Sequence, residues 1–199
     1  MMQVHYYEAT ALCHPGNVPD QVVTLEDYHR KAWQLFTDHA HYRQRERPFI
    51  FRADWLTQSR HLFTIRSIHE FPHAQHHCVD VSHGTELSLS WQWVPTMSTR
   101  LSPTGQRLKR SQHIPAPRER WPNLLVERME HQGFAIDPAT LSISPLGKWH
   151  HRRQKAQQQE VVWVDAQVKV IDETLAANAW LKGVSRLRAY GMGMLCQGG

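Results

Sequence analysis

The 199-residue chain is long enough for one large domain or for two compact domains of about 100 residues each. Hydrophobic residues make up 41% of it and its mean hydropathy is −0.56, so it can form a core under a polar surface, and no window has the roughly 18 apolar residues that a membrane span needs. The formal charge of +5 suits an anionic partner, although proteins without one often carry such a charge.

The cysteines and the first residues bear on cellular location. Cys13, Cys78 and Cys196 are odd in number and show no C-x-x-C spacing, so they predict neither a disulfide framework nor a thiolate zinc site. The first 16 residues lack the basic start and apolar run of a secretory signal. We therefore expect free thiols, a cytoplasmic location and no membrane association.

The first half of the chain begins with a predicted strand over residues 3–12, which are rich in aromatic and other strand-favouring side chains. A helix should follow, because Thr24 and Asp27 have the spacing of a capping box. Apolar side chains then recur at helical spacing, at Leu25, Tyr28, Ala32, Leu35 and Phe36. Residues 48–53 and 61–67 are predicted to form a pair of strands.

Residues 71–83 are interpreted as an irregular, histidine-rich connector. Imidazole and thiolate groups are zinc ligands, so this segment raises the hypothesis of a zinc site. The spacing of its donors fits no standard zinc site, and we expect an ordinary polar connector and no metal. The donors are His73, His76, His77, Cys78 and His83.

The second half begins with a strand near residue 85, where ELSLSWQWV alternates apolar and polar residues with the period of two of a half-buried strand. Residues 95–117 predict a basic hairpin or extended loop. A helix opened by Asn123 and closed by Gly133 follows. Strands are then expected over 139–145 and 160–171, with a strongly basic insert between them.

A last helix is predicted between Asp172, its cap, and Gly183. The chain then continues as a basic, glycine-containing loop and a short strand over residues 189–196. The second half thus has the element order of a ferredoxin-like or RRM-like β-α-β-β-α-β unit, and the first half is interpreted as a degraded copy of it. The expected fold is α+β, with two tandem ferredoxin-like (RRM-like) domains over residues 1–84 and 85–199.

Five segments, in this order, resemble a known protein family. They are YHRKAWQLF (28–36), PFIFRAD (48–54), ELSLSWQWVPTMSTRLSPTGQRLKR (86–110), LLVERMEHQGFAI (124–136) and GVSRLRAYGMGML (183–195). The last is similar to a terminal signature, Gly-x-Gly-x-x-Lys-x-(Phe or Tyr)-Gly-x-Gly-Leu-Leu, although Ser185 stands at its second glycine and Arg188 at its lysine. The resemblance is to the CasE-type CRISPR RNA endoribonucleases, the type I-E branch of the sixth Cas family.

The resemblance implies a metal-independent endoribonuclease without a cofactor. Such an enzyme would bind the stem-loop of CRISPR repeat RNA, cut at the 3′ base of the hairpin and leave a 2′,3′-cyclic phosphate and a 5′-hydroxyl. It would keep its product and join other subunits of an RNA-guided effector complex. A non-catalytic guide-RNA-binding subunit and a zinc-dependent nucleic-acid protein remain the alternatives.

The resemblance assigns the chemistry to His29, with Tyr28 and Lys31 as further candidates. His29 is expected in the second turn of a capped helix, whose N-terminus favours phosphate. From the residues alone, a structural histidine at the edge of an apolar face is the favoured interpretation of His29, and the spacing of Tyr28 puts it on the buried side.

Cations and glycines in three segments are the candidates for RNA contact. Duplex RNA is bound mainly by its shape and its phosphates, which suits clustered basic residues, and glycines let the main chain approach a phosphate chain. A solvated surface role is the alternative for any single one of the cations. The candidates are Arg100, Arg107, Lys109, Arg110, Lys148, Arg152, Arg153, Arg186, Arg188, Gly191 and Gly193.

Overall fold

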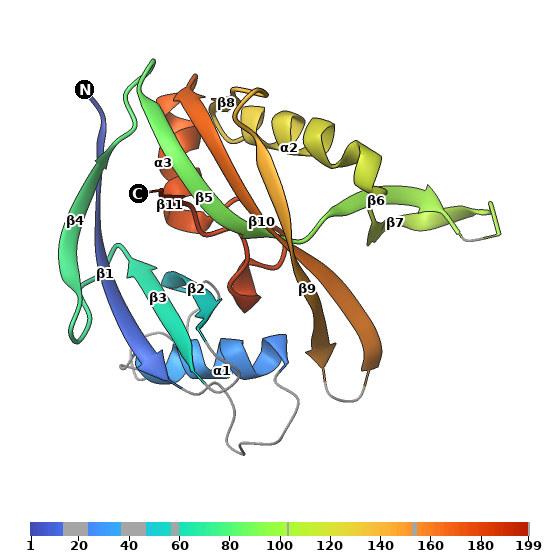
Figure 1. Cartoon of the computed structure of the whole chain (residues 1–199), viewed down its shortest axis with the longest axis horizontal. Helices are drawn as coiled ribbons and strands as arrows, with labels where there is room; N and C mark the ends of the chain where they lie inside the picture. The colour runs from blue at the N-terminus through green and yellow to red at the C-terminus, as the bar shows by residue number, and fades with distance from the viewer. Residues whose placement is uncertain (14–23, 37–46, 57–59, 103, 153–154, 199) are drawn as a thin grey trace.

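The computed structural model describes residues 1–13, 24–36, 47–56, 60–102, 104–152 and 155–198, with the main chain alone for 150–152 and 155–157. Most of the described elements belong to two antiparallel sheets (Figure 1). Within these ranges, no helix is long and apolar enough to cross a membrane.

The first sheet contains only strands from the first half of the chain. They are β1 (Gln3–Cys13), β2 (Phe49–Trp55), β3 (His61–Ser67) and β4 (Gln75–Asp80), in the order β2-β3-β1-β4. Helix α1 (Leu25–Leu35) connects β1 to β2, which gives the strand order of a ferredoxin-like unit. The second helix of that unit is replaced by the short segment 68–74 between β3 and β4.

The N-terminus of α1 has the predicted capping box. The hydroxyl of Thr24 accepts a hydrogen bond from the main-chain N–H of Asp27 (3.3 Å), and the Asp27 carboxylate accepts one from the N–H of Thr24 (2.9 Å). The Thr24 hydroxyl takes up one N–H group of the first turn, and the predicted phosphate-binding role of this helix end stays a prediction.

Strand β4 corrects the prediction of an irregular connector over residues 71–83. It pairs with β1 alone and lies at the edge of the sheet. Its first four side chains are exposed, so the main-chain hydrogen bonds to β1 hold it in place without an alternating apolar pattern that the sequence could reveal.

The second sheet has the same strand order with different elements. Strands β5 (Glu86–Trp93), β8 (Phe134–Ile136), β10 (Lys155–Val170) and β11 (Cys196–Gln197) are arranged β11-β5-β10-β8. Helix α2 (Trp121–Glu130), preceded by the 3₁₀ turn η1 (Arg118–Arg120), precedes β8, and α3 (Glu173–Lys182) lies between β10 and β11. The predicted α+β class with two ferredoxin-like units is therefore confirmed.

Two hairpins lie beyond these four strands. Strands β6 (Thr96–Leu101) and β7 (Arg107–Pro115) form the predicted basic hairpin, which projects away from both sheets (Figure 1). Strand β9 (Ser142–Arg152) pairs with β10, and both extend past the sheet towards α1, which β9 contacts (Figure 1). The predicted basic insert between two short strands was therefore wrong, since its described residues belong to these long strands.

Some of the remaining element boundaries differ from the predictions and others match them. Helix α2 begins at Trp121 rather than Asn123, because Pro122 fits the first turn of a helix. Asp172 caps α3, and Gly133 and Gly183 follow α2 and α3 with φ of 85° and 77°, as predicted. The predicted final strand is reduced to β11, and the 3₁₀ turn η2 (Arg188–Tyr190) precedes it.

Both apolar cores draw residues from both halves of the chain. One core, between α1 and the first sheet, includes Val94, Trp149, Val161 and Met192 from the second half. The other, under α2 and α3, includes Val4, Tyr6, Val79 and Val81 from the first. The two sheets are consequently joined by packed interior surface.

Candidate active site

His29 lies on the face of α1 that turns towards η2. Its Nδ1 is 2.6 Å from the main-chain carbonyl oxygen of Ala189 in η2, and the indole N–H of Trp33 donates to its Nε2 over 3.2 Å. The ring of Tyr190 lies 5.8 Å from the imidazole ring, centroid to centroid. Residues 160 positions apart in the sequence thus meet at this histidine.

These two contacts define the protonation state of the imidazole. A carbonyl oxygen only accepts and an indole N–H only donates, so Nδ1 carries the proton and Nε2 carries the lone pair. This is the neutral form, with its basic nitrogen directed at the Trp33 indole.

Arg47 fixes the position of η2. Its guanidinium donates to the carbonyl of Phe49 at the start of β2 (2.6 Å) and to the carbonyl of Arg188 in η2 (2.8 Å). It also packs over the rings of Phe49 and Phe51. Burial, together with the nearby charge of Arg188, lowers the pKa of Arg47 to about 10. Arg47 therefore brings a partly desolvated positive charge next to the histidine's carbonyl partner.

Sequence reasoning missed Arg47 and Tyr190. Arg47 directly precedes the PFIFRAD segment, and Tyr190 occupies the aromatic position of the glycine signature. Their proximity to His29 depends on contacts between distant segments. The motif positions themselves were the one signal that could have pointed to these side chains.

The structure places Tyr28 in the core beneath the site. Tyr28 is 1% exposed, accepts a hydrogen bond from the indole N–H of Trp55 (2.5 Å) and lies 3.0 Å from His61 Nδ1 through its hydroxyl. Burial raises the pKa of this phenol well above its usual value. This geometry suits the buried role that the spacing of Tyr28 predicted. The catalytic role that the family resemblance implies for Tyr28 stays a prediction.

The charge of Lys31 acts on the Cys13 thiol at the end of β1. It partly offsets the rise that burial causes in the pKa of this thiol. Arg30 is exposed and pairs with Asp27 of the same helix (3.3 Å). Arg47 and Arg188 are cations at η2, which carries the carbonyl partner of His29, and the role of Lys31 stays a prediction.

The glycines of the terminal loop are required by packing. A Cβ on Gly193 would lie 2.3 Å from the main-chain nitrogen of Ser185, and one on Gly191 would lie 2.8 Å from the Phe51 ring. Both glycines are buried, with φ of 81° and 91°. Their predicted RNA contact stays untested, and their present role is to let the loop fold tightly enough to bring Ala189 to His29.

The predicted RNA-binding cations fall into two exposed groups. Arg100, Arg107, Lys109 and Arg110 are exposed on the β6–β7 hairpin, and Lys148, Arg186 and Arg188 are exposed elsewhere. Only the main chain of Arg152 is described, and Arg153 lies outside the described residues.

Arg186 of the terminal loop lies close enough to the base of the β6–β7 hairpin to act on it electrostatically. Burial lowers the pKa of His113 on β7, and the charges of Arg186 and of Arg128 in α2 lower it further. Burial, followed by the charge of Arg186, lowers the pKa of Arg128, whose guanidinium packs over Trp93. These three positive or titratable groups thus lie close enough to repel one another, an arrangement that an anion would relieve.

The histidine-rich segment does not form a metal site in the described part of the chain. Among the described residues, no group of three or more His, Cys, Asp or Glu side chains is close enough to hold a metal ion. His76 and His77 instead stack on His5 and Tyr6 of the neighbouring strand, at 5.3 and 5.5 Å. The described geometry therefore does not support the zinc alternative.

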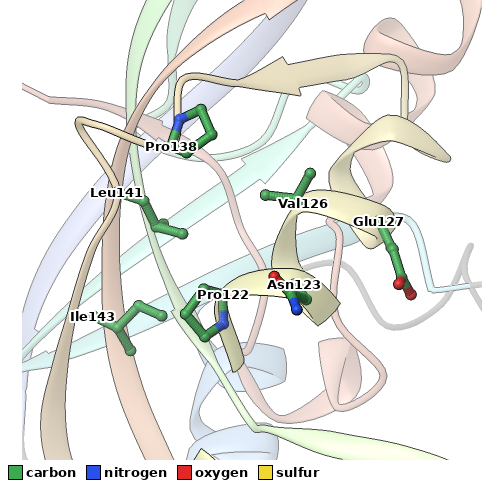
Figure 2. Close-up of a pocket in the computed structure, with 7 residues that line it drawn as sticks. All are labelled: Pro122, Asn123, Val126, Glu127, Pro138, Leu141 and Ile143. Atoms are coloured by element: carbon green, nitrogen blue, oxygen red, sulfur yellow. The ribbon is translucent and has the colours of Figure 1, made fainter. Parts of the chain in front are cut away.

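A separate hollow of about 610 Å³ lies between α2 and the chain that leads into β9 (Figure 2). Its lining is mainly apolar, and Glu127 is its one ionisable group among the described residues. It lacks an acid–base pair and does not include His29. The lining residues are Pro122, Asn123, Val126, Glu127, Pro138, Leu141 and Ile143.

Similar proteins were found by comparison of structures and not by comparison of sequences. No protein-family model matches the sequence, and no curated protein matches it either. Cas6e from Escherichia coli K-12 has a TM-score of 0.65 at 13% identity, over 96% of this chain and 97% of that one. Cse3 from Thermus thermophilus, bound to an RNA representing a pre-cleavage complex, has a TM-score of 0.64 at 19% identity, over 98% and 100%.

A chain of a CRISPR RNA-guided surveillance complex is also similar, with a TM-score of 0.57 at 16% identity, over 96% of this chain and 98% of that one. The match covers both ferredoxin-like units in every case. Over nearly its full length, the chain therefore has the fold of the CRISPR endoribonucleases Cse3 and Cas6e.

Proposed function

We propose that this chain is a metal-independent endoribonuclease that binds the stem-loop of CRISPR repeats and cuts at the 3′ base of the hairpin. It works in the cytoplasm, keeps its product and joins an RNA-guided effector complex. The observation that carries the proposal is the His29 imidazole, whose proton is held on Nδ1 by the Ala189 carbonyl next to Arg47 and Arg188. The likeness to an RNA-bound Cse3 supports the choice of substrate.

The proposed chemistry needs a base, cations and no metal. Nε2 of His29 takes the proton of a ribose 2′-hydroxyl, and the 2′-oxygen attacks the adjacent phosphorus. The bond to the 5′-oxygen breaks, that oxygen takes up a proton, and the products end in a 2′,3′-cyclic phosphate and a 5′-hydroxyl. The exposed Arg188 guanidinium is available to balance the negative charge that builds up on the phosphate.

The contact between Trp33 and His29 imposes a condition on this mechanism. The indole N–H occupies the lone pair that the 2′-hydroxyl needs. RNA must therefore displace Trp33 from Nε2 before proton transfer. The same contact favours the alternative function, a guide-RNA-binding subunit without catalysis, because an occupied lone pair is inactive as a base.

The test is an RNA cleavage assay in EDTA with the repeat RNA of the source organism. His29→Ala is expected to lower the single-turnover rate by about 100-fold or more, because it removes the general base. His131→Ala is the matched control, because His131 Nδ1 also lies 2.6 Å from a main-chain carbonyl oxygen, that of Glu127, on another helix.

Three outcomes separate the candidate functions. Cleavage in EDTA by the unmodified protein and by His131→Ala, but not by His29→Ala, supports the endoribonuclease. Tight RNA binding without cleavage by any variant favours the non-catalytic subunit. Cleavage that EDTA abolishes would contradict the metal-independent mechanism.

A further inference from the structure

We propose that Trp55 is a preformed stacking platform for one unpaired base of the RNA, an inference that rests on the proposed function. Trp55 is the last residue of β2 and pairs with His61 at the start of β3. Its side chain is 57% exposed, whereas most tryptophans of this chain are buried. An aromatic ring with this much open surface can take a further flat partner.

Three contacts hold the Trp55 ring in a single orientation. One face stacks on Trp149 of β9, with centroids 5.3 Å apart and an angle of 13° between the planes. The indole N–H donates to the Tyr28 hydroxyl, and the edge of the ring meets His61 at 5.7 Å. Trp149 is itself buried and stacks on Tyr28 at 5.2 Å. Buried side chains of the core therefore support the Trp55 ring.

Among the described residues, the Trp149 ring stacks on one face of the indole, and the side chain as a whole is 57% exposed. The opposite face is the one that we propose for a base. Because the side chain is already fixed in the free protein, little conformational entropy is lost when a flat partner stacks on it. A rigid, open ring of this kind is the usual receptor for a nucleobase in proteins that bind single strands.

The position of Trp55 indicates an unpaired base rather than a paired one. Bases inside an RNA duplex are covered by their neighbours, whereas bases in flanks and loops can lie on aromatic rings. Trp55 is bonded to Tyr28, the residue before His29 in α1, and its stacking partner Trp149 follows the exposed Lys148. A strand that leaves the cleavage site would find a ring and a cation there.

The experiment measures RNA affinity in EDTA with a repeat RNA that carries one 2′-deoxynucleotide at the cut site, so that it stays intact. The stem-loop is compared with and without its single-stranded flanks, and 2-aminopurine at successive flank positions reports stacking by fluorescence quenching. Trp55→Ala is expected to weaken binding of the flanked RNA by about 5- to 100-fold, the range that base–aromatic stacking contributes. Binding of the bare stem-loop should change by less than about twofold.

Two further variants keep the test decisive. Trp55→Phe retains an aromatic face without the bond to Tyr28, and should keep most of the affinity and the quenching. Leu56→Ala is the matched control, because Leu56 is apolar and also 57% exposed but has no ring. The melting temperature of each variant shows whether the fold is intact.

Unchanged affinity and quenching in Trp55→Ala would overturn the proposal, as would equal losses in Trp55→Ala and Trp55→Phe. A loss confined to assembly with other proteins would assign the ring to a protein contact and would also overturn it. If the unmodified protein binds and cuts the stem-loop, the proposed function stands whatever happens at Trp55. If it binds no RNA, the proposed function itself fails.

Discussion

At the scale of single residues, the imidazole of His29 is positioned by a main-chain carbonyl and an indole from different parts of the chain. The helix motif predicted the histidine, because its residues are consecutive in the sequence. The partners on η2 were not predictable in the same way, since they come from a loop 160 residues away.

Substitution of Trp33 tests whether the indole blocks the basic nitrogen. Trp33→Phe keeps an aromatic ring against Phe49, which Trp33 now meets at 4.9 Å, but removes the N–H donor. Because RNA no longer has to break a hydrogen bond of about 1 kcal/mol, we expect single-turnover cleavage to become roughly fivefold faster. A slower rate would show that the indole orients the imidazole and does not obstruct it.

At the scale of elements, η2 depends on Arg47 for its anchor to β2. Arg47→Lys keeps a positive charge but loses the planar guanidinium, whose separate N–H groups donate to the carbonyls of Phe49 and Arg188 at the same time. We expect the cleavage rate to fall by about 10-fold or more, because charged hydrogen bonds of this kind contribute about 1.5–3 kcal/mol. RNA affinity should stay within about twofold, as the charge is kept.

The control variant is Arg30→Lys. Arg30 is exposed, and its described ion pair is with Asp27 of the same helix. This substitution should leave the rate unchanged. Equal effects of the two substitutions would contradict the anchoring role of Arg47.

We expect RNA binding to depend on pH through His113 on the hairpin of β6 and β7. Burial and the charges of Arg186 and Arg128 lower the pKa of His113, so this imidazole resists protonation in the free protein. RNA phosphates near these cations would raise that pKa, and binding would then take up a proton. Affinity should therefore increase about two- to fivefold as the pH falls from about 7.5 to about 5.5.

His113→Gln should remove this gain and His131→Gln should keep it, as titrations of RNA binding at several pH values would reveal. The same lowered pKa means that His113 favours folding above its unfolded pKa and that this contribution is lost as the pH falls. A gain in affinity that persists in His113→Gln would assign the effect to other histidines.

The elements differ in how far the sequence could predict them. The cap of α1 and the glycine ends of α2 and α3 follow from residues a few positions apart, and all three were found. Strand β4 and the ends of β9 and β10 were missed, because edge strands and projecting hairpins are held by main-chain pairing and need no apolar alternation.

At the scale of the whole molecule, Arg66 joins the two halves. Its guanidinium is 2% exposed, bonds Glu8 within the first sheet and donates to the carbonyls of Trp180 and Leu195 in the second half. It also packs over the rings of Tyr6 and Trp180. This single side chain therefore links both ferredoxin-like units through their shared interior.

Removal of Arg66 should destabilise the protein as one unit. Arg66→Ala leaves Glu8 and two buried carbonyls without their partner, so we expect a loss of about 3–5 kcal/mol in a single unfolding transition. Arg118→Ala breaks the exposed pair with Glu160 and should cost less than about 1 kcal/mol. Denaturant titrations measure both, and two separate transitions in the unmodified protein would contradict a shared core.

Replacement of the attacking group in the RNA tests most directly whether this chain cuts with the RNA's own 2′-hydroxyl at His29. A series of repeat RNAs, each with one 2′-deoxynucleotide near the 3′ base of the hairpin, is incubated with the protein in EDTA. The account predicts that one position abolishes cleavage while binding is unchanged, and that all other RNAs end in a 2′,3′-cyclic phosphate. Cleavage of every RNA in the series, or products with other ends, would contradict it.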